Sequence, residues 1–308
     1  MLRCGVLNVN KPIDISSAGL IDFIKSIIKN KSVKIGHTGT LDPIATGVLL
    51  LTFGPATKIS QCLTNCSKVY SAEMKLGIST DSFDRLGNVT KVKEVNCDLD
   101  KMIDVCKHFT GSIEQTVPIY SAVKKNGKRL YELARNGVSV DQLAFDLPRR
   151  NVTIKQLLVN NFNSPFCDIT VHCSSGTYIR SLIDDIGNKL ECGAHMTKLE
   201  RTSVANFSVK DSLTISKQLT ADDIFSQLIP VGDALSFYPK LVLNSTLLER
   251  LVNTHKIYIP ELNVDPASNP LPYFQFFAED GTFIGIGKTT NTAHCNIIYL
   301  CPTAKIKM

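Results

Sequence analysis

Residues 36–60 read GHTGTLDPIATGVLLLTFGPATKIS, a polar loop followed by a strongly apolar segment. The loop spans residues 36–43 and contains two glycines, two threonines, one histidine and one aspartate, Asp42. Residues 48–53 form an almost continuous apolar run, the pattern of a strand that is buried on both of its faces. The sequence therefore predicts that Asp42 lies in a tight polar loop next to the hydrophobic core.

On the N-terminal side of this loop, the sequence predicts one strand and one helix. Residues 6–9 are mainly apolar and suit a short strand. Apolar residues after Ser17 recur at i, i+3, i+4 and i+7, the spacing of an amphipathic helix, and a serine at position 16 or 17 supplies the N-cap.

On the C-terminal side, strands and helices alternate without a regular period. Residues 68–76 alternate as a half-buried strand does, and Asp98 caps a helix. Residues 152–162 and 167–173 indicate two further strands, and residues 176–180 lead into another helix. The absence of internal repeats in the sequence excludes a solenoid.

The length predicts two domains, since single hydrophobic cores usually stop growing at roughly 250 to 300 residues and this chain has 308. Beyond about residue 233 the composition changes, because a proline-rich stretch at residues 260–272 lies among short apolar segments. We therefore expect a main domain over residues 1–239 and a small domain over residues 240–308.

The bulk composition narrows the class of protein. The formal net charge of +6 favours a polyanionic partner such as nucleic acid without requiring one. Ten cysteines are scattered with no CxxC pair, so we expect buried, reduced thiols and no metal site. No apolar run has the length of a signal peptide or of a membrane span, so the expected location is the cytoplasm, away from membranes.

Four residues attract attention for chemistry, and each also has a structural interpretation. Asp42 before Pro43 is typical of a turn or a helix N-cap. Tyr70 suits the face of a strand, and His37 can stabilise a loop by hydrogen bonding. Arg180 stands near a predicted helix start, where the helix dipole disfavours a cation. The residues alone thus leave a soluble enzyme and an RNA-binding protein as alternatives.

A resemblance to a known family changes this balance. The stretch at residues 36–60 resembles the signature of the TruB branch of pseudouridine synthases. Three further blocks match the same family in order: SKVYSAEMKLGISTDSFDRLGNV at 67–89, CSSGTYIRSLIDDIG at 173–187 and GAHMTKLERTSV at 193–204. VPIYSAVKKNGKRLYELARNG, at residues 117–137, resembles the insertion with which the family grips tRNA.

The resemblance implies a reaction and a set of site residues. The reaction is isomerisation of uridine to pseudouridine in the tRNA T-loop, at the position conventionally numbered 55, without a guide RNA. The implied catalytic residues are Asp42 as nucleophile, Tyr70, and Arg180 as its ion-pair partner. The residues implied to bind the flipped-out uridine are His37, Tyr70, Tyr178 and Leu199. Because the reaction changes neither atoms nor redox state, no cofactor or metal is needed.

The resemblance also implies an architecture and partners. It predicts an α+β pseudouridine synthase fold, whose mixed, mainly antiparallel sheet is flanked by helices and loops, with the tRNA-gripping insertion at about residues 115–150. GTFIGIGK, at residues 281–288, resembles part of a PUA domain, an RNA-binding module rich in strands. The expected partner is the T-arm of tRNA, bound by a monomer that has no obligate protein partner.

Three positions depart from the family's usual blocks, and two alternatives stay open. Asp14 stands where a glycine is usual, Arg85 and Leu86 alter the end of the second block, and Glu200 occupies a site that is often basic. One alternative is the guide-dependent relative that works inside a ribonucleoprotein. The other is a non-catalytic RNA-binding or RNA-folding module.

Overall fold

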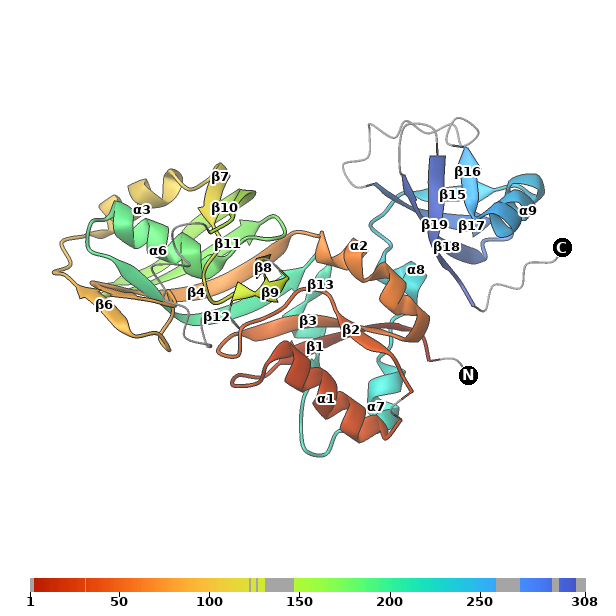
Figure 1. Ribbon diagram of the computed structural model, residues 1–308, viewed down its shortest axis with the longest axis horizontal. Helices are drawn as coiled ribbons and strands as arrows, with labels where there is room; N and C mark the ends of the chain where they lie inside the picture. The colour runs from red at the N-terminus through yellow and green to blue at the C-terminus, as the bar shows by residue number, and fades with distance from the viewer. Residues whose placement is uncertain are drawn as a thin grey trace.

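The computed structural model describes residues 3–30, 32–121, 123–125, 127–130, 147–258, 272–289 and 294–302. Within these residues one sheet has ten strands and another has five (Figure 1). The ten strands are β1 (Gly5–Lys11), β2 (Ile35–His37), β3 (Thr46–Phe53), β4 (Lys68–Leu76), β7 (Gly111–Thr116), β10 (Arg149–Asn163), β11 (Phe166–Cys173), β12 (Ala194–Val204), β13 (Phe207–Ser208) and β14 (Leu213–Thr214).

Helices and two short hairpins complete this part of the chain. The hairpins pair β5 (Ile78–Thr80) with β6 (Val89–Val92) and β8 (Lys124–Lys125) with β9 (Lys128–Arg129). Among the described residues the α-helices are α1 (Ser17–Ile28), α2 (Ser60–Thr64), α3 (Leu99–Lys107), α6 (Ile179–Lys189), α7 (Ala221–Ser226), α8 (Val231–Ala234) and, beside the five-stranded sheet, α9 (Ser245–Thr254), and the 3-10 helices are η1 (Gly54–Ile59) and η2 (Val209–Asp211).

The large sheet is mixed and mainly antiparallel. Its order is β14-β1-β3-β12-β4-β11-β10-β7, with β2 added to β3 and β13 added to β12. Only β1 with β14 and β3 with β12 pair in parallel among its described strand pairs. The predicted α+β class with a mixed sheet is confirmed.

Strand β3 is buried on both faces, as its apolar run predicts. Leu49 and Leu51 belong to the main core, which also receives side chains from α1, α3 and α6. Val48 and Leu50 point to the other side, into a second cluster with residues of α2 and α8. Asp42 therefore belongs to a loop that ends at the strand joining the two clusters.

Helix α1 begins as the sequence predicts. Ser16 is its N-cap, and the Ser16 hydroxyl accepts a hydrogen bond from the backbone N–H of Gly19. Leu20 and Ile24 lie on the buried face of the helix, against the main core. Ser17, the residue after the N-cap, is buried and hydrogen-bonds to Leu41 in the Asp42 loop. The start of α1 is therefore tied to that loop.

The five-stranded sheet has its own core and also contacts the large sheet. Its order is β15-β17-β18-β19-β16, where the strands are β15 (Lys240–Leu243), β16 (Lys256–Tyr258), β17 (Tyr273–Ala278), β18 (Phe283–Thr289) and β19 (His294–Leu300). It lies near β1 and away from β7 and β10 (Figure 1). Tyr273 and Tyr299 pack into the cluster that contains Val6 of β1. The domain limits at residues 239 and 240 remain a prediction.

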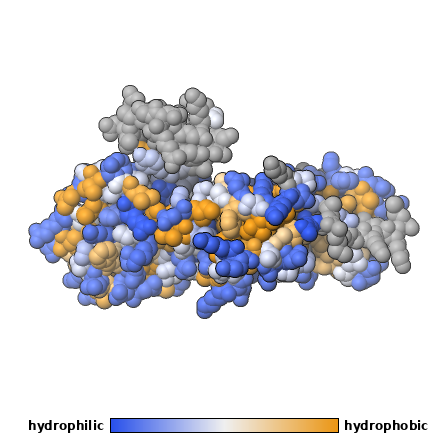
Figure 2. Space-filling model, turned by 90° about the horizontal axis from the view of Figure 1, so that it is seen from below, coloured by the Kyte–Doolittle hydropathy of each residue, from blue (hydrophilic) through white to orange (hydrophobic). Residues whose placement is uncertain are grey.

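On the face drawn in Figure 2, the most extended hydrophobic area lies near the middle of the described surface. Hydrophobic side chains on that face form separate patches bordered by hydrophilic ones (Figure 2). Within the described ranges, no helix is both long enough and apolar enough to cross a membrane.

Gly47, at the start of β3, gives a prediction about stability. Its φ is +101°, and a Cβ added there would lie 2.3 Å from the backbone oxygen of Arg201. We expect Gly47→Ala to lower the free energy of unfolding by about 4 kcal/mol in urea denaturation, because strain and a backbone clash combine.

Gly111 supplies the matched control for this substitution. It has the same φ of +101°, but nothing lies within 4 Å of an added Cβ. Gly111→Ala should therefore cost only the conformational strain, about 1 to 2 kcal/mol. Equal losses for the two variants would show that the contact between Gly47 and Arg201 is loose.

Candidate active site

The loop that carries Asp42 is a hydrogen-bonded turn anchored to α1. The backbone N–H of Ala45 donates to the carbonyl of Asp42 at 3.0 Å, which closes a turn with Pro43 inside it. The buried Ser17 hydroxyl accepts from the N–H of Leu41 at 2.9 Å and donates to the carbonyl of the same residue at 3.1 Å. The turn interpretation is therefore correct, and it leaves the Asp42 side chain, 33% exposed, facing outward.

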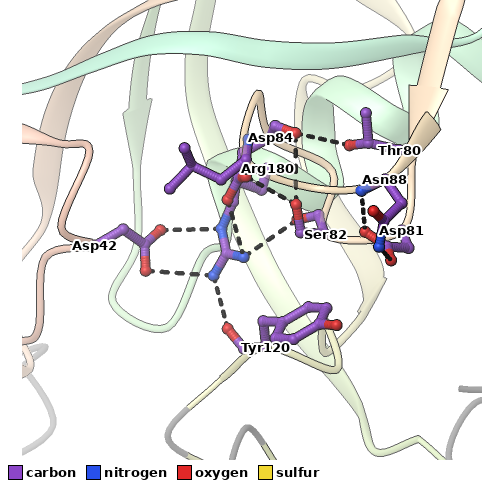
Figure 3. A network of polar contacts seen from close by, with 9 residues as sticks. Asp42, Thr80, Asp81, Ser82, Asp84, Asn88, Tyr120 and Arg180 are labelled. Atoms are coloured by element: carbon purple, nitrogen blue, oxygen red, sulfur yellow. Dashed lines mark hydrogen bonds and ion pairs between the residues drawn. The ribbon is translucent and has the colours of Figure 1, made fainter. Parts of the chain in front are cut away.

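Arg180 meets Asp42 through two nitrogens (Figure 3). Nε lies 2.9 Å from Oδ2 of Asp42, and Nη2 lies 3.3 Å from Oδ1. The Arg180 side chain is only 5% exposed. A planar guanidinium that bonds both carboxylate oxygens fixes the direction of the carboxylate as well as its charge. The structure thus brings together two residues that are 138 positions apart in the sequence.

The remaining donors of Arg180 are also occupied. Nη1 donates to the carbonyl of Ser82 at 3.2 Å and lies 3.6 Å from a carboxylate oxygen of Asp84. Nη2 also donates to the carbonyl of Tyr120 at 2.9 Å. Figure 3 shows these partners along the edges of the guanidinium that do not face Asp42. Arg180 is therefore held in one orientation, and Asp42 is the exposed partner.

Asp84 is a site residue that the sequence reasoning missed. Its Oδ1 accepts from the Ser82 hydroxyl at 2.7 Å and from the N–H of Leu86 at 2.9 Å, while Oδ2 faces Arg180. Its side chain is 10% exposed. Asp84 therefore partly neutralises the charge of Arg180 from the Nη1 side of the guanidinium, whereas Asp42 contacts Nε and Nη2. The block at residues 67–89 contained it, but no local pattern links it to Arg180.

Lys11 is a second residue that the sequence reasoning missed, and its side chain hydrogen-bonds to the Asp42 loop. It is fully buried, and its Nζ donates to the carbonyls of Pro12 and Ile15 at 2.8 Å each and of Pro43 at 3.3 Å. Burial lowers the pKa of the Lys11 ammonium to about 8, although nearby Asp42 opposes this shift. Lys11 thus ties the first strand to the residue that follows Asp42.

Comparison with known proteins places this arrangement in a family. A family model described as TruB family pseudouridylate synthase (N terminal domain) matches residues 25–179, and one described as tRNA pseudouridylate synthase B C-terminal domain matches residues 180–230. A tRNA pseudouridine synthase B of Clostridium novyi is 41% identical over 287 residues, covering 92% of this chain and 94% of that protein. This chain belongs to the TruB family. The tRNA pseudouridine synthase B of Clostridium kluyveri, at 38% identity over 283 residues, covers the same shares.

Membership of the TruB family makes the chain a pseudouridine synthase, which is an isomerase. Among solved structures, a chain of a Cbf5-Nop10-Gar1 complex superimposes with a TM-score of 0.70 at 23% identity, covering 96% of this chain and 84% of that one. At this identity the likeness concerns the fold alone. It confirms the predicted pseudouridine synthase fold.

The remaining predicted residues of this TruB chain lie on different elements. Tyr70 on β4 and Leu199 on β12 are both buried and belong to the main core cluster. Tyr178 precedes α6, where its N–H donates to Gln115 at 2.9 Å and its carbonyl accepts from the same side chain at 3.1 Å. Burial raises the pKa of both tyrosines, and burial lowers the pKa of His37 at the end of β2. Burial thus favours the neutral form of the His37 ring.

The departures from the usual TruB blocks are compatible with this geometry. Asp14 has a φ of +63°, a left-handed conformation that aspartate tolerates better than most residues, and its N–H donates to the carbonyl of Pro43 at 2.8 Å. Arg85 and Leu86 have exposed side chains; the backbone N–H of Arg85 donates to the carbonyl of Met196 on β12, and that of Leu86 donates to the Asp84 carboxylate. Glu200 is half-buried on β12, next to Leu199 in sequence but on the opposite face of the strand.

Two further predictions concern the tRNA-gripping insertion and metal binding. Residues 131–146 of the predicted tRNA-gripping insertion, including Arg135, lie outside the described residues. As for metal, no group of three or more His, Cys, Asp or Glu in the described ranges is arranged to hold an ion. The cysteines are all free thiols.

Proposed function

We propose that this TruB-family enzyme isomerises the T-loop uridine of tRNA, at position 55, to pseudouridine, without a guide RNA and with Asp42 as the nucleophile. The observation that supports it best is the ion pair between Arg180 and Asp42. Arg180 is buried and each of its guanidinium nitrogens has a partner, so it directs the partly exposed Asp42 carboxylate outward. The tRNA substrate is supported by the names of the curated relatives, which are tRNA pseudouridine synthases.

Isomerisation of uridine requires a carboxylate that is ionised and points toward the reacting nucleoside. The C1′–N1 glycosidic bond breaks, the uracil turns within the site, and a C1′–C5 bond forms while the proton on C5 is lost and N1 gains one. A carboxylate can attack an electron-poor carbon or stabilise positive charge at C1′, as carboxylates do in glycoside hydrolysis. Arg180 bonds both oxygens of the Asp42 carboxylate and so fixes the direction in which it points.

The target base must leave the RNA stack to reach Asp42. Flipping costs a few kcal/mol, and stacking on an aromatic ring returns about 1 to 3 kcal/mol. Tyr70 is the ring proposed to stack on the uracil, in a pocket completed by Tyr178 and Leu199. His37 is proposed to fill the space that the base vacates, a role that suits its neutral ring.

RNA binding is assigned to two further regions. The hairpin consists of Lys124 and Lys125 on β8 and Lys128 and Arg129 on β9. We propose that it begins the tRNA-gripping insertion. The five-stranded sheet is proposed to act as a PUA-like RNA-binding domain. RNA helices are recognised mainly through shape, phosphates and 2′-hydroxyls, which a basic hairpin and a small sheet can contact. The enzyme is proposed to act as a monomer in the cytoplasm, without a cofactor.

The decisive test maps pseudouridine in RNA after incubation with the purified protein. An unmodified full-length tRNA and its isolated T-arm are treated, then analysed by mass spectrometry after carbodiimide labelling. We expect one pseudouridine, in the T-loop, in both RNAs. Product that forms only when a guide RNA and accessory proteins are added would support the guide-dependent alternative. Binding without product would support the non-catalytic one.

Tyr70→Phe separates the stacking of this residue from its hydroxyl chemistry. The ring remains, so the dissociation constant for tRNA should change little. In the elimination version of the reaction the hydroxyl is the candidate general base, and such proton transfers contribute about 10²-fold or more. We expect a single-turnover rate about 10²-fold lower in rapid-quench measurements. An unchanged rate would remove the hydroxyl from the mechanism.

A further inference from the structure

Arg201 on β12 is a buried cation that lacks a carboxylate partner. Its side chain is among the largest that are fully buried, at 1% exposure. Among the described residues it makes no ion pair. Taking a charge out of water is costly unless other groups compensate it. The acceptors that compensate Arg201 are backbone carbonyls on either side of Asp42 in the sequence.

The guanidinium bridges the two ends of the Asp42 loop. Nε donates to the carbonyl of Val48 at 2.7 Å, and Nη2 donates to the carbonyl of Gly39 at 3.1 Å. Asp42 lies between these two residues in the sequence. The backbone of Arg201 also packs directly against Gly47, at the same end of the loop. One side chain thus sets the span of the segment that presents Asp42.

Arg201 is also the cross-strand neighbour of Tyr70, since the two residues are directly opposite each other on the antiparallel strands β12 and β4. Tyr70 and Asp42 come from different elements, and Arg201 is paired across the sheet with Tyr70 while its guanidinium bonds both ends of the Asp42 loop. A planar group with five donors can bond several acceptors at fixed angles, which an ammonium group cannot do.

We propose that Arg201 is a positioning residue that fixes the Asp42 loop and the Tyr70 ring relative to each other. The inference rests on the proposed function, in which the two side chains act on the same uridine. Arg201 acts through the backbone carbonyls that it bonds and through its place opposite Tyr70 in the sheet, and its buried side chain does not itself reach the RNA. Its role differs from that of Arg180, which bonds the Asp42 carboxylate directly.

Lys68 provides a matched control inside the same sheet. It is also a buried cation, 5% exposed, and its Nζ donates to the carbonyls of Thr64 and Cys66. It stands on β4 beside Tyr70 but bonds no residue of the Asp42 loop. Lys68→Met should therefore reproduce the loss of a buried cation without moving that loop.

The test compares Arg201→Lys, Arg201→Met and Lys68→Met with wild type on tRNA. For both Arg201 variants we expect single-turnover pseudouridine formation to fall about 100-fold, the loss that a misplacement of about 1 Å can cause. Their dissociation constants for tRNA should stay within about threefold of wild type, since the groups that bind RNA are intact. Lys68→Met should keep the wild-type rate even where its midpoint of urea unfolding falls.

Hydrogen–deuterium exchange gives a second readout that needs no RNA. In Arg201→Met the amides of residues 38–47 should exchange at least about tenfold faster than in wild type, because local opening becomes easier. Lys68→Met should leave these amides unchanged. The Arg201→Lys variant keeps the experiment informative if Arg201→Met does not fold.

Each unfavourable outcome has a distinct meaning. A wild-type rate in Arg201→Lys, or unchanged exchange in the loop, would overturn the positioning role. A rate loss in Lys68→Met equal to that of the Arg201 variants would reduce Arg201 to a purely structural residue. If wild-type protein forms no pseudouridine in tRNA, the proposed function fails, and the exchange measurement still decides whether Arg201 sets the loop.

Discussion

Asp42→Asn will bind tRNA with unchanged affinity and will form pseudouridine at a rate at least about 10⁴-fold below wild type, since enzymes lose activity on this scale when a nucleophile is removed. The amide has the shape of the carboxylate, and the loop around it is held by Ser17 and Lys11, so the fold should persist. A neutral amide can neither attack carbon nor stabilise positive charge at C1′. Single-turnover assays with mass-spectrometric detection measure the rate, and filter binding measures the affinity.

The control for this variant changes the same charge at a distance from the site. Asp22→Asn alters an exposed position on α1 and should leave both rate and affinity at wild-type values. If the pure Asp42→Asn protein forms pseudouridine faster than deamidation can restore the aspartate, Asp42 is not the nucleophile. An equal loss of tRNA binding would show instead that Asp42 has a role in recognition.

The Asp42 loop shows how far local sequence reasoning reaches. The turn followed from Asp-Pro, and the buried strand followed from the apolar residues 48–53, because both depend on neighbours in the chain. The same local evidence favoured a structural role for Asp42 at least as strongly as a catalytic one. The structure shows that the turn and the ion pair coexist, since the backbone of Asp42 closes the turn while its side chain meets Arg180.

Contacts between distant residues explain what the sequence pattern could not predict. Asp42 and Arg180 are separated by 138 positions, and only the resemblance to a family connected them. Lys11 and Arg201 bond mainly backbone carbonyls, and a carbonyl is present at every position, so no residue type marks the partner. Asp84 escaped notice because a lone acid in a loop has many possible roles, and only the tertiary fold places it behind Arg180.

Arg180→Met should damage both activity and stability. Without the guanidinium, Asp42 loses the two bonds that aim it, so we expect the single-turnover rate to fall about 10³-fold, as it does when a preorganised electrostatic partner is removed. Asp84, only 10% exposed, would face an apolar side chain in place of its cation. Removing one partner of a buried pair costs about 3 to 5 kcal/mol, and the exposure of Asp42 favours the lower value, measurable by urea unfolding.

A second substitution separates these two effects. In Arg180→Met with Asp84→Asn the uncompensated buried charge is gone, so most of the lost unfolding free energy should return, whereas the rate should stay low because Asp42 still has no partner to direct it. Arg149→Met gives the stability baseline, since its pair with Glu114 is exposed on both sides and is worth about 1 kcal/mol or less. Recovery of the rate along with stability would mean that Arg180 serves Asp84 and the local fold. The bidentate contact with Asp42 would then be incidental to the chemistry.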